Sequence, residues 1–327
     1  MATPPIVTQY AGPTPYKLTN VETNINVFNS DFNPNQISNL AIWLDGRDVF
    51  NNGSNNPADG VKMNYWANKA PNGITVTQTN ELYRPNYGSY NLGVYFDNNN
   101  TGSSGNINGY NTTYTSANNN ETIFILLKYA TTNSVNYNLL YPSIADGGRQ
   151  LSLESNTPTS FLLNTAILTG GGSTRELKVG SVTSFVTTLV SSWNDSIELR
   201  HYINGGLAGI TAPTTPFTGS ANTLIGTDNY AGNEGLFAYI SEMIIYSNAL
   251  SDNDRQKVES YLYWKWLNFD LDNENPYKTK PYPNINSNLI PPIPRNLFSG
   301  LPTLDSNNYP LIKNFIQLPN RLRNVMF

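Results

Sequence analysis

Residues 236–266, LFAYISEMIIYSNALSDNDRQKVESYLYWKW, contain the longest apolar run of the chain, followed directly by its clearest helix start. The run over 236–246 is rich in Ile, Tyr and Phe, which favours a buried strand. Ser251 is a good N-cap and Asp254 stands three residues later, as in a capping box. The apolar residues of one helix face recur at every fourth position: Val258, Leu262 and Trp266. This pattern predicts a helix that latches onto a sheet edge or a sandwich end.

Upstream of this stretch, short apolar runs alternate with polar, turn-rich sequence, which is the spacing typical of an all-β sandwich. The strand candidates lie at 37–45, 74–79, 92–96, 122–129, 150–153, 160–163, 185–191, 196–203 and 223–226. Asn204 and Gly205 supply the positive φ of a tight turn, so 197–203 is expected to pair antiparallel with 207–210. Residues 97–120 are rich in Asn, Gly, Ser and Thr, which predicts a long exposed loop.

The composition excludes several classes of site. The chain has no cysteine, which excludes disulfides, thiolate nucleophiles and zinc-thiolate centres. His201 is the only histidine, so a multi-histidine metal site is also excluded, and we interpret its imidazole as hydrogen-bonded or solvated rather than catalytic. No phosphate-binding loop or dinucleotide fingerprint is present. The N-terminus lacks the features of a signal peptide, and no apolar stretch reaches the length of a membrane span, so neither is expected.

Two proline-rich arms flank the globular pattern. We predict an extended N-terminal arm at 1–35, one domain at 36–268 and an extended arm at 269–327. From residue 276 onward the chain carries six Lys and Arg residues and only Asp305 as an acid, too sparse a basic density for a nucleic-acid arm. Apolar residues are scattered through this tail, which predicts that it packs on another protein. The candidate partner-binding residues are Lys278, Lys280, Arg295, Phe298, Phe315, Arg321 and Arg323.

Several quoted motifs carry a family resemblance over about residues 37–267. They are IWLDGRD, WANKAPNG at 66–73, GVYFDN, TIFILLKY, LRHYINGGLAG, LIGTDN and the closing strand and helix. In this order they resemble a concanavalin A-like jelly roll of the laminin G-like type, as found in surface proteins of bacteria, phage and large DNA viruses. The resemblance implies two curved antiparallel sheets and a role in binding glycans or proteins, or a purely structural role.

Candidate acidic sites are few. A retaining glycosidase of this fold needs two carboxylates close together, and none of the ten glutamates has a carboxylate two residues later. We interpret Glu242 as a structural acid paired with Arg255 or Lys257. Turn formation explains Asp45 and Asp48, and helix capping explains Asp252 and Asp254. The remaining candidates for calcium or glycan binding are Asp228 and Glu234.

Two functional hypotheses follow, neither of them enzymatic. The first is a structural virion component, a minor capsid or surface protein of a large DNA virus, whose arms contact neighbouring subunits. The alternative is a glycan-binding attachment module. Its contact surface would be the loop tyrosines Tyr83, Tyr87, Tyr90, Tyr110 and Tyr114. No cofactor is expected beyond the calcium ion that Asp228 and Glu234 could hold.

Overall fold

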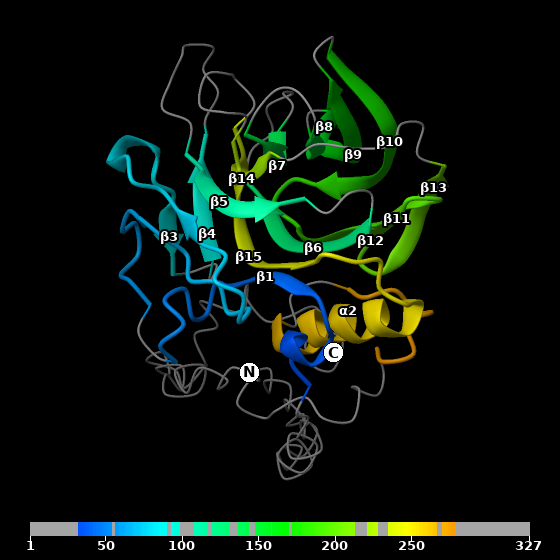
Figure 1. Cartoon of the computed structure of the whole chain (residues 1–327), viewed down its shortest axis with the longest axis horizontal. Coiled ribbons are helices and arrows are strands. Elements are labelled where there is room, and N and C mark those ends of the chain that lie inside the picture. Colours follow the sequence, from blue (N-terminus) through cyan, green and yellow to red (C-terminus); the bar gives the residue numbers. More distant parts are fainter. Residues whose placement is uncertain are drawn as a thin grey trace, which may run out of the picture.

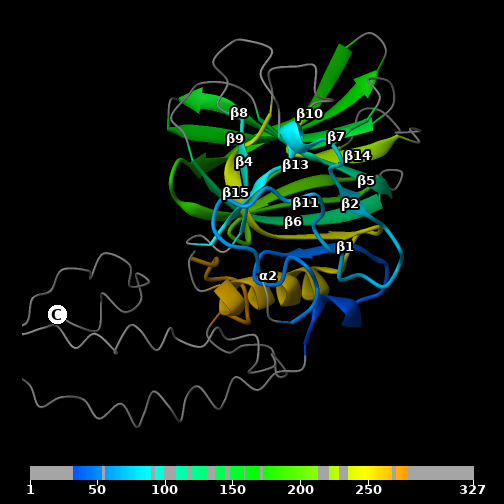
Figure 2. The same ribbon diagram turned by 90° about the vertical axis from the view of Figure 1, so that its left-hand side faces the viewer.

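The computed structural model describes residues 32–53, 56–89, 93–98, 108–116, 120–130, 137–143, 148–157, 159–169, 172–212, 221–227, 235–266 and 270–278. Two antiparallel sheets lie face to face, and helix α2 (Asp252–Trp266) covers the outer face of one of them (Figures 1 and 2). It is the one α-helix among the described residues. The predicted all-β jelly-roll sandwich with a C-terminal helix is therefore confirmed.

The sheet that carries the helix has eight strands. Seven of them follow the order β13-β12-β11-β6-β15-β4-β3, and β1 also pairs with β15. Their bounds are β1 Leu40–Asp45, β3 Asn86–Gly88, β4 Gly93–Asp97, β6 Asn120–Tyr129, β11 Thr187–Asp195, β12 Leu199–Ile203, β13 Gly206–Thr211 and β15 Phe237–Tyr246. The predicted strand at 236–246 thus lies in the interior of this sheet, with β6 on one side and β4 and β1 in succession on the other.

The opposite sheet has seven strands in the order β10-β9-β8-β7-β14-β5-β2. Their bounds are β2 Val76–Thr77, β5 Tyr110–Thr115, β7 Tyr137–Pro142, β8 Gly148–Thr157, β9 Ser160–Thr169, β10 Gly172–Thr183 and β14 Asn222–Ile225. The short strand β2 forms one edge of this sheet, and the candidate site lies beside it.

Alternating side chains give the eight-stranded sheet two apolar faces. On β15, Met243 and Ile245 belong to the core between the sheets, whereas Ile244 and Tyr246 belong to the cluster under α2. The helix therefore does not sit at a sheet edge or a sandwich end, as the sequence suggested, but across a sheet face. No helix in the described ranges has the length and apolar character needed to cross a membrane.

The turns that the sequence singled out form as expected. Asn204 and Gly205 have φ values of 52° and 85°, and Ile203 pairs with Gly206 across the hairpin. At the start of α2, Ser251 Oγ accepts a hydrogen bond from the Asp254 amide at 3.1 Å. Ser251 Oγ also donates to the carboxylate of Asp254 at 3.0 Å. The predicted N-cap is therefore confirmed.

The long loop expected at 97–120 is wrong in its second half, where the chain forms β5. Tyr110 and Tyr114 are buried in the core while Asn111, Thr113 and Thr115 are exposed. This is the alternation of a strand with one buried face. The polar composition of the segment hid the pattern, because the outward positions are Asn and Thr and one inward position is the buried Thr112.

Candidate functional site

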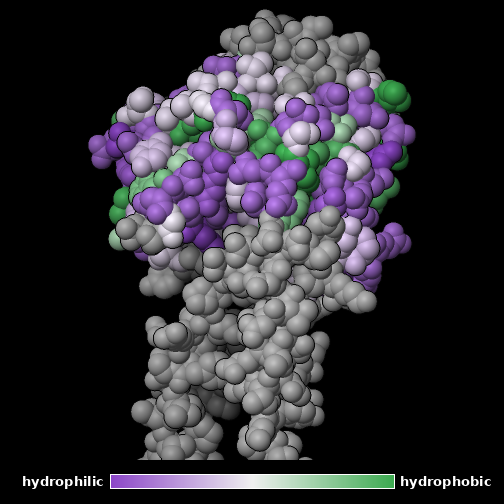
Figure 3. Space-filling view, turned by 60° about the horizontal axis from the view of Figure 1, so that its bottom comes forward, coloured by the Kyte–Doolittle hydropathy of each residue, from purple (hydrophilic) through white to green (hydrophobic). Residues whose placement is uncertain are grey.

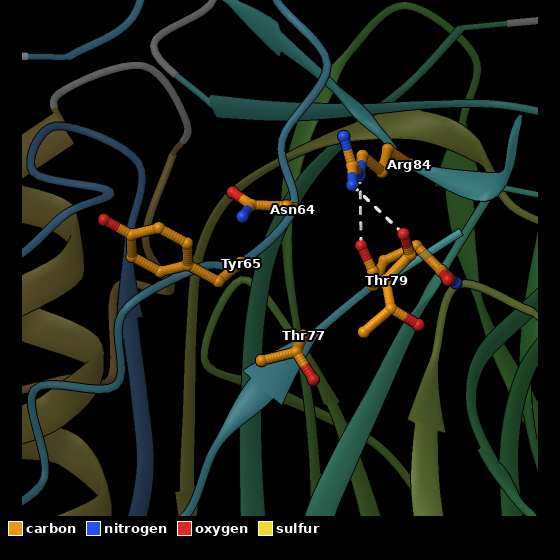
Figure 4. A pocket seen from close by; sticks show the side chains of 6 residues that line it. Asn64, Tyr65, Thr77, Thr79 and Arg84 are labelled. Atoms are coloured by element: carbon orange, nitrogen blue, oxygen red, sulfur yellow. Dashed lines mark hydrogen bonds between the residues drawn. The ribbon is translucent and has the colours of Figure 1, made fainter. Parts of the chain in front are cut away.

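An open hollow of about 400 Å³ lies beside β2, and mainly polar side chains line it (Figure 4). Its lining residues are Asn64, Tyr65, Thr77, Gln78, Thr79 and Arg84. None of them was a candidate from the sequence. The hollow is formed by two segments, 64–65 and 77–84, so no single run of sequence could reveal it.

The backbone fixes these two segments against each other. The Gln78 amide donates to the Asn64 carbonyl at 2.7 Å, and the Trp66 amide donates to the Val76 carbonyl at 3.1 Å. Trp66 is fully buried in the core between the sheets. The ribbon that carries the site is therefore anchored to the rigid part of the sandwich.

Arg84 closes one side of the hollow. Its Nε donates to the Gln78 carbonyl at 3.1 Å and its Nη2 to the Thr79 carbonyl at 3.0 Å (Figure 4). A guanidinium has five N–H donors, and these two bonds hold its plane in place. The other donors have no acceptor among the described residues, which leaves them available toward the hollow.

Tyr65 stands on the other side, and in the close-up Asn64 lies between it and Arg84, with Thr77 below them (Figure 4). Tyr65 is 38% exposed, and its ring packs against Phe50 with 5.2 Å between the ring centroids. Two further exposed apolar side chains come from the same part of the chain, Val61 at 44% and Leu82 at 55% exposure. Of these three residues only Tyr65 lines the hollow, so the lining offers one supported aromatic side chain beside its polar groups.

Of the four remaining lining side chains, one has a structural role and three can form hydrogen bonds with a ligand. The amide of Gln78 is buried, donates to the Gly109 carbonyl at 2.9 Å and accepts from the Asn80 amide at 3.0 Å. It therefore holds the floor of the hollow. The side chains of Asn64, Thr77 and Thr79 make no hydrogen bond within the described part of the chain and reach solvent in part or fully. They add an amide and two hydroxyl groups to the available donors and acceptors.

Glu242 is buried in a polar cluster between β15, β1 and α2. Its Oε1 accepts hydrogen bonds from Trp43 Nε1 and Tyr261 Oη, both at 2.8 Å. Its Oε2 accepts from Trp266 Nε1 at 2.6 Å and pairs with Lys265 Nζ at 2.8 Å. The expected partners Arg255 and Lys257 are wrong, because the alternation of β15 places Glu242 on the face under the C-terminal half of α2. The carboxylate is fully enclosed and paired, which is a structural rather than a catalytic arrangement.

Asp45 continues this cluster toward the surface. Its Oδ2 lies 2.8 Å from both Lys265 Nζ and Lys69 Nζ, and Lys69 also pairs with Asp48 at 3.0 Å. Burial alone would raise the pKa of Asp45, but the two lysine charges bring it well below its ordinary value. Asp45 and Asp48 also accept backbone amides of the following turn, from Arg47 and Asn52 respectively, as the sequence indicated.

His201 lies inside the sandwich, where its Nε2 is 2.7 Å from Thr165 Oγ1 of the opposite sheet. Burial lowers the pKa of this imidazole to about 3. A neutral, enclosed ring that joins two sheets agrees with the prediction of a hydrogen-bonded rather than a catalytic histidine.

The other predicted site residues are mostly outside the described residues. This applies to Asp228, Glu234, Lys280, Arg295, Phe298, Phe315, Arg321, Arg323 and Tyr90. Lys278 is described and pairs within its own segment, with Asp270 at 2.9 Å and Asn273 at 2.7 Å. In the described ranges, no three His, Asp or Glu side chains form a group that could hold a metal ion.

The tyrosines chosen from the sequence as glycan contacts do not form a surface. Tyr87, Tyr110 and Tyr114 are buried in the core, and Tyr83 is half-buried in the short 3-10 helix η3 (Glu81–Tyr83). Tyr65 was missed because it stands alone in KMNYWANK, next to the buried Trp66. A signal was present, however: Tyr65 falls just outside the predicted strands, where an aromatic side chain is not required for packing.

Comparison with known proteins gives no family assignment. No family model matches the chain, and no curated protein matches it. Among solved structures, the sialidase module CBM40 of Ruminococcus gnavus bound to α2,3-sialyllactose is 20% identical over 42% of this chain and 81% of that one, with a TM-score of 0.35. A SAP-like pentraxin from Limulus polyphemus is 13% identical over 45% and 72% of the two chains, with a TM-score of 0.36. The binding domain of botulinum neurotoxin serotype D/C is 12% identical over 71% and 56%, with a TM-score of 0.47. At these scores the fold rests on the sheets described above, and no function passes from these proteins to this chain.

Proposed function

We propose that this protein is a glycan-binding module without catalytic activity and that a sugar binds in the hollow between Tyr65 and Arg84. The observation that carries the proposal is the combination, in one open hollow, of a supported aromatic face with unpaired amide, hydroxyl and guanidinium groups. A sugar ring presents an apolar C–H face and a rim of hydroxyl groups, and the lining offers a partner to each.

The mechanism is recognition alone. Tyr65 would cover the apolar face of the ring, while Asn64 and Thr77 would exchange hydrogen bonds with its hydroxyl groups. Backbone bonds to the rigid sandwich hold these groups in place before the sugar arrives, so little conformational freedom is lost on binding. No pair of carboxylates lines the hollow, and hydrolysis of a glycosidic bond needs such a pair.

A glycan array probed with the full-length chain tests the proposal. We expect a set of related glycans to be retained and Tyr65→Ala to reduce their binding at least about tenfold, which corresponds to about 1.4 kcal/mol. The matched control is Phe185→Ala, which removes another exposed aromatic ring from the turn between β10 and β11. Equal losses in both variants, or an array without any retained glycan, would count against the proposal.

The assembly role predicted from the arms stays a prediction, as does a location in a virion. Of the arm residues named as partner contacts, only Lys278 is described, and it pairs with its own segment. A chain truncated after residue 278 that still entered its native assembly would remove the basis of that hypothesis.

A further inference from the structure

Arg84 carries the only charge among the six residues that line the hollow. The nearest flanking charges in the same segments are Lys62 and Glu81, one of each sign, and Lys62 Nζ donates to the Glu81 carbonyl at 3.1 Å. A ligand in the hollow therefore meets a net positive charge and no carboxylate from the lining.

The position of the guanidinium matters as much as its charge. Two of its N–H groups are bonded to the carbonyls of Gln78 and Thr79, so its plane is fixed, and the remaining N–H groups are unpaired in the described part of the chain. A planar, pre-positioned guanidinium matches the two oxygen atoms of a carboxylate or sulfate. A neutral hydroxyl would use only part of this donor set and leave the charge without compensation.

From this geometry we infer that the hollow selects acidic sugars, with the carboxylate or sulfate on Arg84 and the ring against Tyr65. The inference rests on the proposed glycan-binding function and adds the substrate class to it. Tyr65 and Arg84 both line the hollow, and in the close-up Asn64 lies between them (Figure 4), so we expect one sugar residue with an acidic substituent to meet both.

The test is an array with glycans printed in matched neutral, uronic-acid, sialylated and sulfated forms, probed with the full-length chain and followed by titration calorimetry of the best pair. We expect the acidic member of a pair to bind at least about tenfold more tightly than the neutral one. Raising the ionic strength should weaken the acidic member alone, because salt screens the charge. The separate acidic forms distinguish a carboxylate from a sulfate as the group that Arg84 holds.

Three variants assign the effect to Arg84. Arg84→Gln should abolish the preference, and Arg84→Lys should retain only part of it, because lysine keeps the charge and loses the planar fork. Lys257→Gln removes a remote cation on α2 that pairs with Asp254 and should leave the preference unchanged. Thermal unfolding of each variant, compared with the wild-type chain, separates lost binding from lost folding.

The outcomes distinguish this inference from the proposed function. Equal binding of neutral and acidic glycans would overturn the acidic selectivity and leave the glycan-binding function standing. An acidic preference that survives in a folded Arg84→Gln variant would place the anion elsewhere and overturn the inference. If no glycan of any form were retained, both would fail.

Discussion

Glu242 joins three elements at one point. This residue belongs to β15, and its fully buried carboxylate contacts Trp43 of β1 and three residues of α2, namely Tyr261, Lys265 and Trp266. A buried charge that loses its partner is costly, because the partner left behind has no water around it. The cluster therefore holds β1 and α2 against β15, the interior strand of the sheet.

We expect Glu242→Ala to lower the free energy of unfolding by roughly 3–5 kcal/mol, since Lys265 then keeps only Asp45 as an acidic partner. Urea unfolding followed by tryptophan fluorescence would measure this. Glu198→Gln is the matched control, because the pair between Glu198 and Arg200 is partly exposed, and its loss should cost less than about 1 kcal/mol. Similar losses in the two variants would contradict a sealing role for Glu242.

Glu259 should give the protein a measurable pH dependence. Burial raises the pKa of this carboxyl from its ordinary 4.5 to about 7. The charge of Arg255, whose Nη1 lies 2.5 Å from Glu259 Oε1, lowers the pKa and offsets only part of this rise. Between these two pH values the folded chain binds more protons than the unfolded chain, so this group makes stability fall as pH rises from 4.5 to 7. His201 has the opposite sign, since its lowered pKa makes stability fall as pH drops below 6.5.

Comparing Glu259→Gln with the wild-type chain isolates the first effect. As pH rises through this window, the free energy of unfolding of the variant should increase relative to that of the wild type by up to roughly 3 kcal/mol, because one pKa unit corresponds to about 1.36 kcal/mol. The constant cost of leaving Arg255 without its partner cancels from the slope. A difference between the two unfolding free energies that does not change with pH would show that Glu259 titrates normally.

At the level of helices and strands, capping and turn residues determine where each element begins and ends. Packing against the opposite layer determines which face of the element is buried. The N-cap of α2 illustrates the first part. Ser251→Ala should lower the free energy of unfolding by about 1 kcal/mol, because the Asp254 amide loses its acceptor. Ser251→Asp keeps a capping oxygen and should remain near the wild type in the same denaturant titration. Equal destabilisation by both substitutions would contradict the capping role.

The sequence predicted the elements whose signals are local. The Asn204-Gly205 hairpin, the strand over 236–246 and the capped helix are examples, because turn chemistry and apolar periodicity act within a few residues. β7 and β10 were not predicted. β10 carries Gly, Ser, Thr, Arg and Lys over most of its length and becomes a strand by pairing with β9, a tertiary effect on a sequence of weak propensity.

The candidate site could not be predicted for a related reason. Its lining comes from two segments joined by backbone bonds between Asn64 and Gln78 and between Trp66 and Val76. Such backbone hydrogen bonds do not depend on residue type, so they produce no recognisable pattern of side chains in the sequence. Neither the role of Gln78 as a floor nor the free donors of Arg84 follows from residue type, because both depend on which carbonyls the fold brings near.

At the scale of the whole molecule, the described residues form one sandwich with chain packed on it beyond the predicted bounds of 36 and 268. Phe32 packs edge-on against Tyr261, with ring centroids 6.1 Å apart. Residues 270–278 lie along α2, where Ser260 Oγ and Trp264 Nε1 both donate to the Tyr277 carbonyl. Seen from the bottom of Figure 1, this side of the molecule is largely hydrophilic, with apolar side chains near the middle of the view (Figure 3).

Segment 270–278 should therefore count as part of the folded unit. A chain that ends at residue 278 is expected to unfold at the temperature of the full chain. In a chain that ends at residue 269, the free energy of unfolding should fall by at least about 2 kcal/mol. The reason is that Leu271 is buried, and its removal exposes the apolar surface that it covers. Calorimetry of the two truncations checks this, and equal unfolding temperatures would show that the segment adds nothing to stability.

The most direct test of the central claim, that the hollow beside β2 binds a sugar, is a titration of the isotopically labelled chain with the best array glycan, followed by amide chemical shifts. We expect saturable shifts confined to residues 62–66 and 76–85, and their loss in Tyr65→Ala. Saturable shifts on another face of the sandwich, or no shifts at glycan concentrations that saturate the array signal, would contradict it.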